Sequence, residues 1–269
     1  MISNDDKFFD YSSINAFLAQ NSIWIKNNPC VSPDFCLDWN RFAEGLKDTA
    51  GLTEYSRSTF SSEHGEWTLV EDQWGDHAWR LRISGEINED LCPLSNGFDS
   101  EEFIYFPASF ENLVRMKNLI QESDPGNNAF PTSRGNLGKS TLGIGARFTT
   151  LHWDGVDWAM SRLGMGLTAN QNSIPRELVY DVNEMLAGNL DTVPFPFIGC
   201  DVPEGHQGQS VEGMTHGCIL AKFKNGFHKL GISWSFNADH QPIGGKFDER
   251  EDQLVAGCMF ASYITFDLS

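Results

Sequence analysis

The stretch "SWSFNADHQPIGGKFD" (233–248) places an acid and an imidazole side by side directly after an apolar segment. Asp239 supplies a carboxylate that can accept a proton, and His240 supplies an imidazole, a common ligand for divalent metals. A carboxylate base beside a metal ion is suited to removing a proton next to a polarised carbonyl. The pair therefore predicts either a metal-assisted base at the mouth of a cavity or a polar turn that closes a strand.

The segments that must position this pair alternate in type from residue 142 onward. Strand-like runs are "LGIGARFTT" (142–150), "MGLTAN" (165–170), "PFPFIG" (194–199), "ISWSFNA" (232–238) and "YITFDLS" (263–269). Between them, helices are expected at 154–164, 173–188, 211–231 and 248–262. Such an order requires parallel strands, whose carboxyl ends meet at one edge and bind ligands there.

Polar residues follow each of these strands, and three of the strand ends carry a histidine. Helix capping accounts for some of them, such as Ser173 and Asp154, but not for the histidines. The polar residues at the expected strand ends are Thr149, Thr150, His152, Asn170, Gln171, Asn172, Ser173, Asp201, Glu204, His206, Gln207, Asn237, Asp239, His240, Asp267 and Ser269.

The expected fold class is α/β, with two regions. Residues 131–269 form a parallel (βα) barrel-type sheet, either doubly wound or an incomplete TIM barrel. Residues 1–130 form an irregular α+β region, with strands in 66–74, 77–87 and 103–106 and a helix over 110–123 that Ser109 caps. The Pro-, Gly- and Asn-rich segment 123–140 marks the boundary.

Bulk composition excludes several function classes. The 269 residues include 37 acidic and 19 basic ones, a net charge of -18. Such a field repels nucleic acid and anionic membranes, which excludes both as default partners. A local group of Arg147, Arg176 and Lys246 can still bind the carboxylate of a small molecule. Six scattered cysteines without a CxxC pair, and the lack of a signal peptide or of an apolar run near ~20 residues, favour a cytoplasmic location.

Two long stretches carry a resemblance to a known family. "FNADHQPIGGKFDEREDQLVAGCMFASYITFDLS" (236–269) is similar to the tagaturonate/fructuronate epimerases, in which an Ala-Asp-His strand end precedes an acidic helix and a Phe-Thr-Ile-Asp strand. "RFTTLHWDGVDWAMSRLGMGLTANQNSIPRE" (147–177) resembles that family's Ile-Thr-Thr strand and Ala-Gln-Gln-Ser loop. Together the similarity covers about residues 143–269.

The resemblance implies a metal-dependent epimerase that acts on a ketohexuronate. Asp239 matches the family's proton acceptor, and His240 matches one ligand of a divalent metal ion (Zn, Mn, Co or Ni). Polar positions around the sugar correspond to Thr150, Gln171 and Asn172. From charge alone, and not from the resemblance, the substrate carboxylate is expected at Lys246, Arg147 or Arg176. The alternatives are a metal-dependent sugar-phosphate aldolase or isomerase and a non-catalytic half-barrel that binds a sugar acid.

Departures from the family pattern affect the expected partners. The family's proton donor and remaining metal ligands lie on later strands than any in this chain, and 190–210 lengthen one connection. A last core strand without a covering helix leaves an unpaired edge. We therefore expect that a C-terminal half is missing, that the chain pairs with a second copy as a homo-oligomer, or that N-terminal strands complete the sheet.

Overall fold

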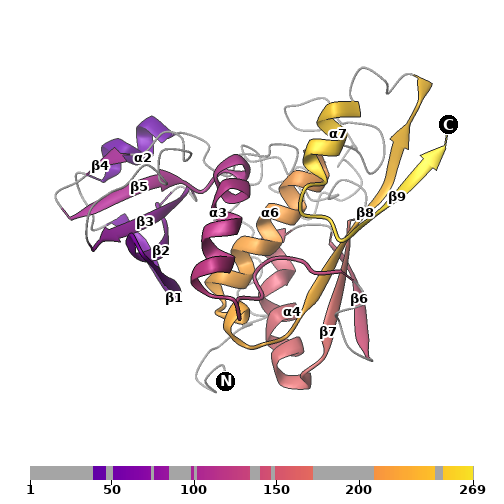
Figure 1. The fold of residues 1–269 in the computed structure, drawn as a ribbon, viewed down its shortest axis with the longest axis horizontal. Coiled ribbons are helices and arrows are strands. Elements are labelled where there is room, and N and C mark those ends of the chain that lie inside the picture. The colour runs from indigo at the N-terminus through magenta and orange to yellow at the C-terminus, as the bar shows by residue number, and fades with distance from the viewer. Residues whose placement is uncertain are drawn as a thin grey trace, which may run out of the picture.

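The computed structural model describes residues 39–46, 51–73, 76–84, 98–99, 102–133, 140–146, 149–171, 209–245 and 251–268. These residues form a mixed α/β structure with one antiparallel and one parallel sheet. Figure 1 shows the helices α3, α4 and α6 between the two sheets. The helix and strand predictions at 173–188 and 194–199 lie outside the described residues.

The antiparallel sheet has the strand order β1-β2-β3-β5-β4. Its strands are β1 (Thr53–Ser62), β2 (Gly65–Glu71), β3 (His77–Ile83), β4 (Phe98–Asp99) and β5 (Phe103–Pro107). The expected pairing of 66–74 with 77–87 is confirmed by β2 and β3, and 103–106 is confirmed as β5. Within the expected α+β region these strands form an ordered antiparallel sheet, and consecutive buried residues such as Leu69 and Val70 lie on both of its faces.

Side chains alternate between the two faces of this sheet, and each face packs against a separate hydrophobic core. One face contributes Trp67, Trp79 and Phe106 to the main core, next to α3 (Phe110–Ser123) and α6 (Gln209–Lys224). The other face contributes Val70 and Tyr105 to a smaller core with α2 (Trp39–Gly45). The sheet is therefore the middle layer between α2 and the central helices.

Helix α3 begins and packs as its sequence predicts. The Ser109 hydroxyl accepts a hydrogen bond from the backbone N–H of Asn112 at 3.2 Å, which satisfies one of the helix's unpaired donors. The residues that face the core are Phe110, Leu113, Met116 and Ile120, spaced at helical intervals and buried.

The parallel sheet has the order β6-β7-β8-β9, and all three of its pairings are parallel, as the alternation of segments predicts. Its strands are β6 (Thr141–Ala146), β7 (Gly166–Gln171), β8 (Trp234–Ile243) and β9 (Tyr263–Leu268), joined through α4 (Thr149–Leu163), α6, the short 3₁₀ helix η7 (Phe227–Lys229) and α7 (Glu251–Gly257). β7 pairs directly with β8, so no described strand lies between them. These four strands do not by themselves close a barrel, which stays a prediction.

Helix α6 joins the two parts of the chain. It contacts α4, α7 and β7 on one side and α3 and β1 on the other. At its end, the Lys224 ammonium donates to Glu71 Oε2 on β2 at 2.8 Å, and His77 Nε2 lies 2.9 Å from the same oxygen. Burial raises the pKa of Glu71, but Lys224 and His77 more than reverse this effect and hold it well below its usual range.

The boundary expected near residue 130 stays a prediction, and one continuous core includes residues from both sides of it, such as Trp79 and Phe223. Among the helices described, none is long and apolar enough to cross a membrane.

Candidate active site

The parallel sheet has one apolar and one polar face. Leu167 and Ala169 on β7, and Trp234, Phe236 and Ala238 on β8, are all buried in the main core. Because successive side chains of a strand point to opposite faces, the residues between them lie on the other side of the sheet. These are Thr168, Asn170, Ser235, Asn237 and Asp239.

Hydrogen bonds between neighbouring strands link these polar side chains. Ser235 Oγ on β8 donates to Thr168 Oγ1, its partner on β7, at 3.2 Å. At the next pair, Asn237 Nδ2 donates to the side-chain Oδ1 of Asn170, and Thr265 Oγ1 on β9 donates to Asn237 Oδ1 at 3.2 Å. The polar row therefore crosses β7, β8 and β9.

The Asp239 carboxylate receives amide donors on both of its oxygens. Asn170 Nδ2 donates to Oδ2 at 3.0 Å, and Asn237 Nδ2 lies within 3.3 Å of Oδ1. These contacts assign the amide orientations, since a carboxylate requires the NH₂ group of each asparagine to face it. Asp239 is half-buried. The strands thus hold a single carboxylate in a fixed orientation, with its charge complemented by two side-chain dipoles.

The backbone of β8 is irregular at this residue. Ala238 pairs with Ile264 and Gln241 pairs with Phe266, so three steps along β8 match two steps along β9. This register shift is a β-bulge at Asp239-His240, and the Gln241 side chain donates to the Asp239 carbonyl oxygen at 2.6 Å. Bulges re-aim side chains and are common next to active sites.

The expected strand end at Asp239-His240 was wrong. β8 continues to Ile243, because Gln241, Pro242 and Ile243 pair with Phe266, Asp267 and Leu268 of β9. The pair therefore lies within a strand, and neither a turn nor a helix cap holds it. The His240 side chain lies outside the described part, so its role as a metal ligand stays a prediction.

The structure places the other predicted residues as follows. Thr150 lies in the first turn of α4, which begins at Thr149 and not at Asp154, directly after the carboxyl end of β6. Gln171 is the last residue of β7, beside Ala146 of β6. The side chains of both lie outside the described part. The predicted binding residues whose backbone is also outside it are Arg147, Asn172, Arg176 and Lys246.

The structure brings together three residues that the sequence placed at two strand ends, Asn170 at one and Asn237 and Asp239 at the other. Sequence reasoning missed Thr265, although its alternation with Ile264 and Phe266 on β9 indicates the polar face. Among the residues described, no group of three or more His, Cys, Asp or Glu side chains is arranged to hold a metal ion.

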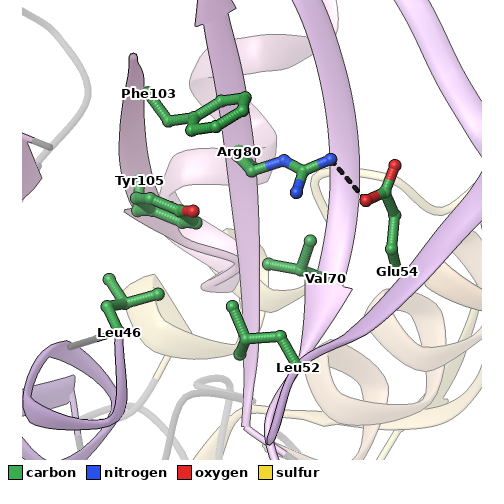
Figure 2. A pocket seen from close by; sticks show the side chains of 7 residues that line it. All are labelled: Leu46, Leu52, Glu54, Val70, Arg80, Phe103 and Tyr105. Atoms are coloured by element: carbon green, nitrogen blue, oxygen red, sulfur yellow. Dashed lines mark ion pairs between the residues drawn. The ribbon is translucent and has the colours of Figure 1, made fainter. Parts of the chain in front are cut away.

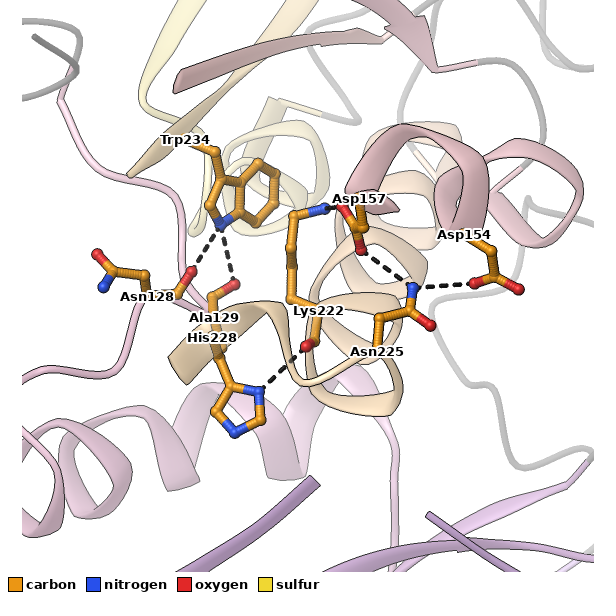
Figure 3. Close-up of polar contacts among 8 residues, drawn as sticks. All are labelled: Asn128, Ala129, Asp154, Asp157, Lys222, Asn225, His228 and Trp234. Carbon is orange, nitrogen blue, oxygen red and sulfur yellow. Dashed lines mark hydrogen bonds and ion pairs between the residues drawn. The ribbon is translucent and has the colours of Figure 1, made fainter. Parts of the chain in front are cut away.

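The apolar face of β8 rests on a buried ion pair (Figure 3). Lys222 of α6 donates to Asp157 Oδ1 of α4 at 2.5 Å, and both side chains are fully buried. The ammonium lies 4.8 Å from the Trp234 ring, at the start of β8. The Trp234 indole N–H donates to the carbonyl oxygens of Asn128 and Ala129, so the same ring also links the start of β8 to residues 128–129.

No family model matches the chain, and a search of the curated proteins found no match either. Among solved structures, the native crystal structure of fructuronate-tagaturonate epimerase UxaE from Cohnella laeviribosi is 17% identical over 85% of this chain, with a TM-score of 0.49. Its complexes with one and two glycerols give TM-scores of 0.45 and 0.44, at 17% identity over 84% and 16% over 77% of this chain.

This chain spans 37%, 36% and 33% of the length of those three structures. All three identities are 17% or lower, and all three TM-scores are below 0.5. The proposal below rests on the side chains of the parallel sheet and on the sequence motif that contains them.

Proposed function

We propose that the chain carries part of the active site of a sugar-acid epimerase, with Asp239 as the proton acceptor. The observation that supports this is the pair of amide donors, Asn170 and Asn237, that hold both oxygens of one carboxylate on the polar face of a parallel sheet. A base must be held in place relative to the proton that it removes. The amides fulfil this requirement without introducing a competing acid.

The proposed substrates are ketohexuronates of the tagaturonate/fructuronate type. Side-chain amides and hydroxyls both donate and accept hydrogen bonds, which suits the hydroxyls of a sugar. Thr150, Gln171 and Asn172 are proposed to contact these hydroxyls, and Arg176 or Lys246 the substrate carboxylate, since a cation pairs strongly with such a group.

A retro-aldol step is compatible with a single carboxylate base. Asp239 takes the proton of the β-hydroxyl, the oxygen electrons form a carbonyl, and the electrons of the broken carbon–carbon bond form an enolate of the ketone. After the carbonyl group rotates, the enolate carbon attacks it, the carbon–carbon bond re-forms, and Asp239 returns the proton to the new hydroxyl. Substrate and product therefore have the same atoms and oxidation level.

The proposal includes a divalent metal ion, which would polarise the ketone when bound. The described residues do not fit such an ion on their own, because Asp239 is the single acid of the polar row and three ligands are not found together. We propose that His240 binds the metal ion together with further ligands that lie beyond the described residues.

The experiment is interconversion of tagaturonate and fructuronate followed by ¹H NMR, with Mn²⁺ or Zn²⁺ and with EDTA. Asp239→Asn is expected to lower turnover by about 10²–10⁴-fold, the usual contribution of a general base. Asp252→Asn on the exposed surface of α7 is the matched control and is expected to leave turnover unchanged. Undiminished turnover by Asp239→Asn would refute the assignment of the base.

The alternative to an enzyme is a non-catalytic module that binds a sugar acid. One observation favours it: among the described residues, the polar row contains a single carboxylate and no second acid. Tagaturonate binding by calorimetry without any turnover would support this alternative. Turnover of phosphorylated ketoses, with none of tagaturonate, would support a sugar-phosphate aldolase or isomerase instead.

A further inference from the structure

A pocket lies on the side of the antiparallel sheet that faces α2, away from the parallel sheet. Its volume is about 350 Å³. Figure 2 shows the lining side chains, which come from the residue after α2, from the segment entering β1, and from β1, β2, β3 and β5: Leu46, Leu52, Glu54, Val70, Arg80, Phe103 and Tyr105. Binding pockets for small molecules have volumes from about 300 Å³ upward and a mainly apolar lining with a few placed polar groups.

One wall of the pocket is polar. Arg80 donates to Glu54 Oε2 at 2.7 Å, and its guanidinium lies 4.7 Å from the centre of the Phe103 ring. Burial raises the pKa of the Tyr105 phenol, with Arg80 opposing the rise, so that Tyr105 carries a neutral hydroxyl at neutral pH. The Glu54 side chain is 49% exposed and that of Arg80 17%, so the opening lies at Glu54.

The opposite wall is aliphatic and consists of Leu46, Leu52 and Val70, which Figure 2 shows below the polar groups. These residues belong to the small core under α2 and hold the shape of the pocket. A ring-sized apolar group that enters here is removed from water on that side, which stabilises its binding.

The polar wall determines both the net charge and the hydrogen-bonding groups of the ligand that fits the pocket. A guanidinium has five N–H donors and a carboxylate accepts through two oxygens, so the contacts of Arg80 with Glu54 and with the Tyr105 hydroxyl leave capacity on both charged groups. Their charges cancel. A group that accepts from Arg80 and donates to Glu54 fits this wall, whereas a second carboxylate is opposed by Glu54.

We propose that this pocket binds a small neutral molecule that has an apolar ring and a primary carboxamide. The carbonyl oxygen of the amide accepts from Arg80, its NH₂ group donates to Glu54, and the ring lies against the aliphatic wall. This site is separate from the row around Asp239, because the two lie on different sheets.

The probes for the experiment are benzamide and benzoate, which share a ring and differ in charge and in donor groups. In titrations followed by protein NMR, benzamide is expected to bind with a Kd of about 1–10 mM, the range for so small a ligand, and about 10-fold more tightly than benzoate. Leu52→Trp, which fills the aliphatic wall, is expected to weaken benzamide binding about 10-fold or more.

Glu54→Gln provides the sharper readout. It removes the negative charge and leaves the Arg80 charge uncompensated, so the preference is expected to reverse and benzoate to bind more tightly than benzamide. Glu63→Gln, an equal charge change on a side chain that is 69% exposed, is the control and keeps the wild-type preference. Circular dichroism melting verifies that each variant is folded.

Absence of benzamide binding to the wild type, or equal binding to folded Leu52→Trp, overturns the proposal. An unchanged benzamide preference in Glu54→Gln overturns the assignment of the polar wall. The epimerase assay with Asp239→Asn is independent of all these outcomes, because Leu52 and Glu54 line a pocket on the antiparallel sheet and Asp239 lies on the parallel sheet.

Discussion

The buried pair Lys222–Asp157 provides a demanding test of the packing between α4, α6 and β8. We expect Lys222→Met to lower the free energy of unfolding by about 3–5 kcal/mol, because the substitution leaves a buried carboxylate without its counter-charge. Methionine keeps most of the volume of the lysine stem, so that the change in charge dominates the effect. Burial raises the pKa of Asp157, and the Lys222 ammonium and the Asn225 amide are the groups that oppose this rise.

The structure favours the upper part of this range. Both side chains are fully buried and 2.5 Å apart, so water cannot replace the lost partner. The ammonium also lies 4.6 Å from the ring of Trp153, 5.0 Å from that of Phe227 and 4.8 Å from that of Trp234. Desolvated cation–π contacts contribute up to about 2 kcal/mol, and they are lost together with the charge.

The assay is urea unfolding at pH 7, followed by tryptophan fluorescence, with ΔG compared at unchanged m-value. The double variant Lys222→Met/Asp157→Leu is expected to recover most of the loss, to within about 1–2 kcal/mol of the wild type, because no unpaired charge remains. Arg115→Met is the control: its exposed pair with Glu111 on α3 is expected to contribute less than about 1 kcal/mol.

A cost below about 1 kcal/mol for Lys222→Met would refute the reasoning, since a buried charge cannot lose its partner so cheaply. A double variant as unstable as the sum of the two single variants would refute it as well, because the two charges would then be uncoupled.

Three further outcomes follow from contacts described above. Asn237→Ala is expected to lower epimerase turnover about 10-fold by freeing the Asp239 carboxylate, with KM changed less than kcat; an unchanged kcat in the NMR assay would contradict its positioning role. Ser109→Ala is expected to cost about 1 kcal/mol in urea unfolding through the lost cap of α3, and a cost near zero would contradict the cap. Burial lowers the pKa of His228 from 6.5 to about 4. Because the unfolded chain binds the proton first, the stability that neutral His228 contributes is present above pH ~6.5 and is lost toward pH ~4, by about 3 kcal/mol. In His228→Asn this part of the pH dependence is expected to disappear from unfolding curves measured between pH 7 and 4.5.

Local patterns predicted much of the fold. The spacing of Phe110, Leu113 and Met116 after Ser109 indicates one helix and its first residue, and both are confirmed. The alternation of strand-like and helix-like segments after residue 140 predicted the parallel pairing. The antiparallel sheet was harder to predict, because both of its faces are buried and polar residues such as Thr68 interrupt the expected two-residue alternation.

The candidate site was predictable at the level of residues but not of backbone. Asn170, Asn237 and Asp239 stood out because polar residues follow buried ones at the ends of expected strands. The length of β8 was not predictable from local sequence, since "DHQP" is typical of a turn and only pairing with β9 keeps it extended. The burial of Lys222 could not be predicted from the sequence, because a lysine in a helix usually faces water.

The burial of helix α6 limits which substitutions the chain tolerates there. Residues 215–223 of this helix are all buried, between partners that belong to different sheets. The helix packs against β1 of one sheet and β7 of the other, which are far apart along the chain. A substitution that improves the packing of α6 on one sheet can therefore disturb its packing on the other. A library randomised over these positions is therefore expected to yield far fewer folded clones than one randomised over the outward-facing residues of α3.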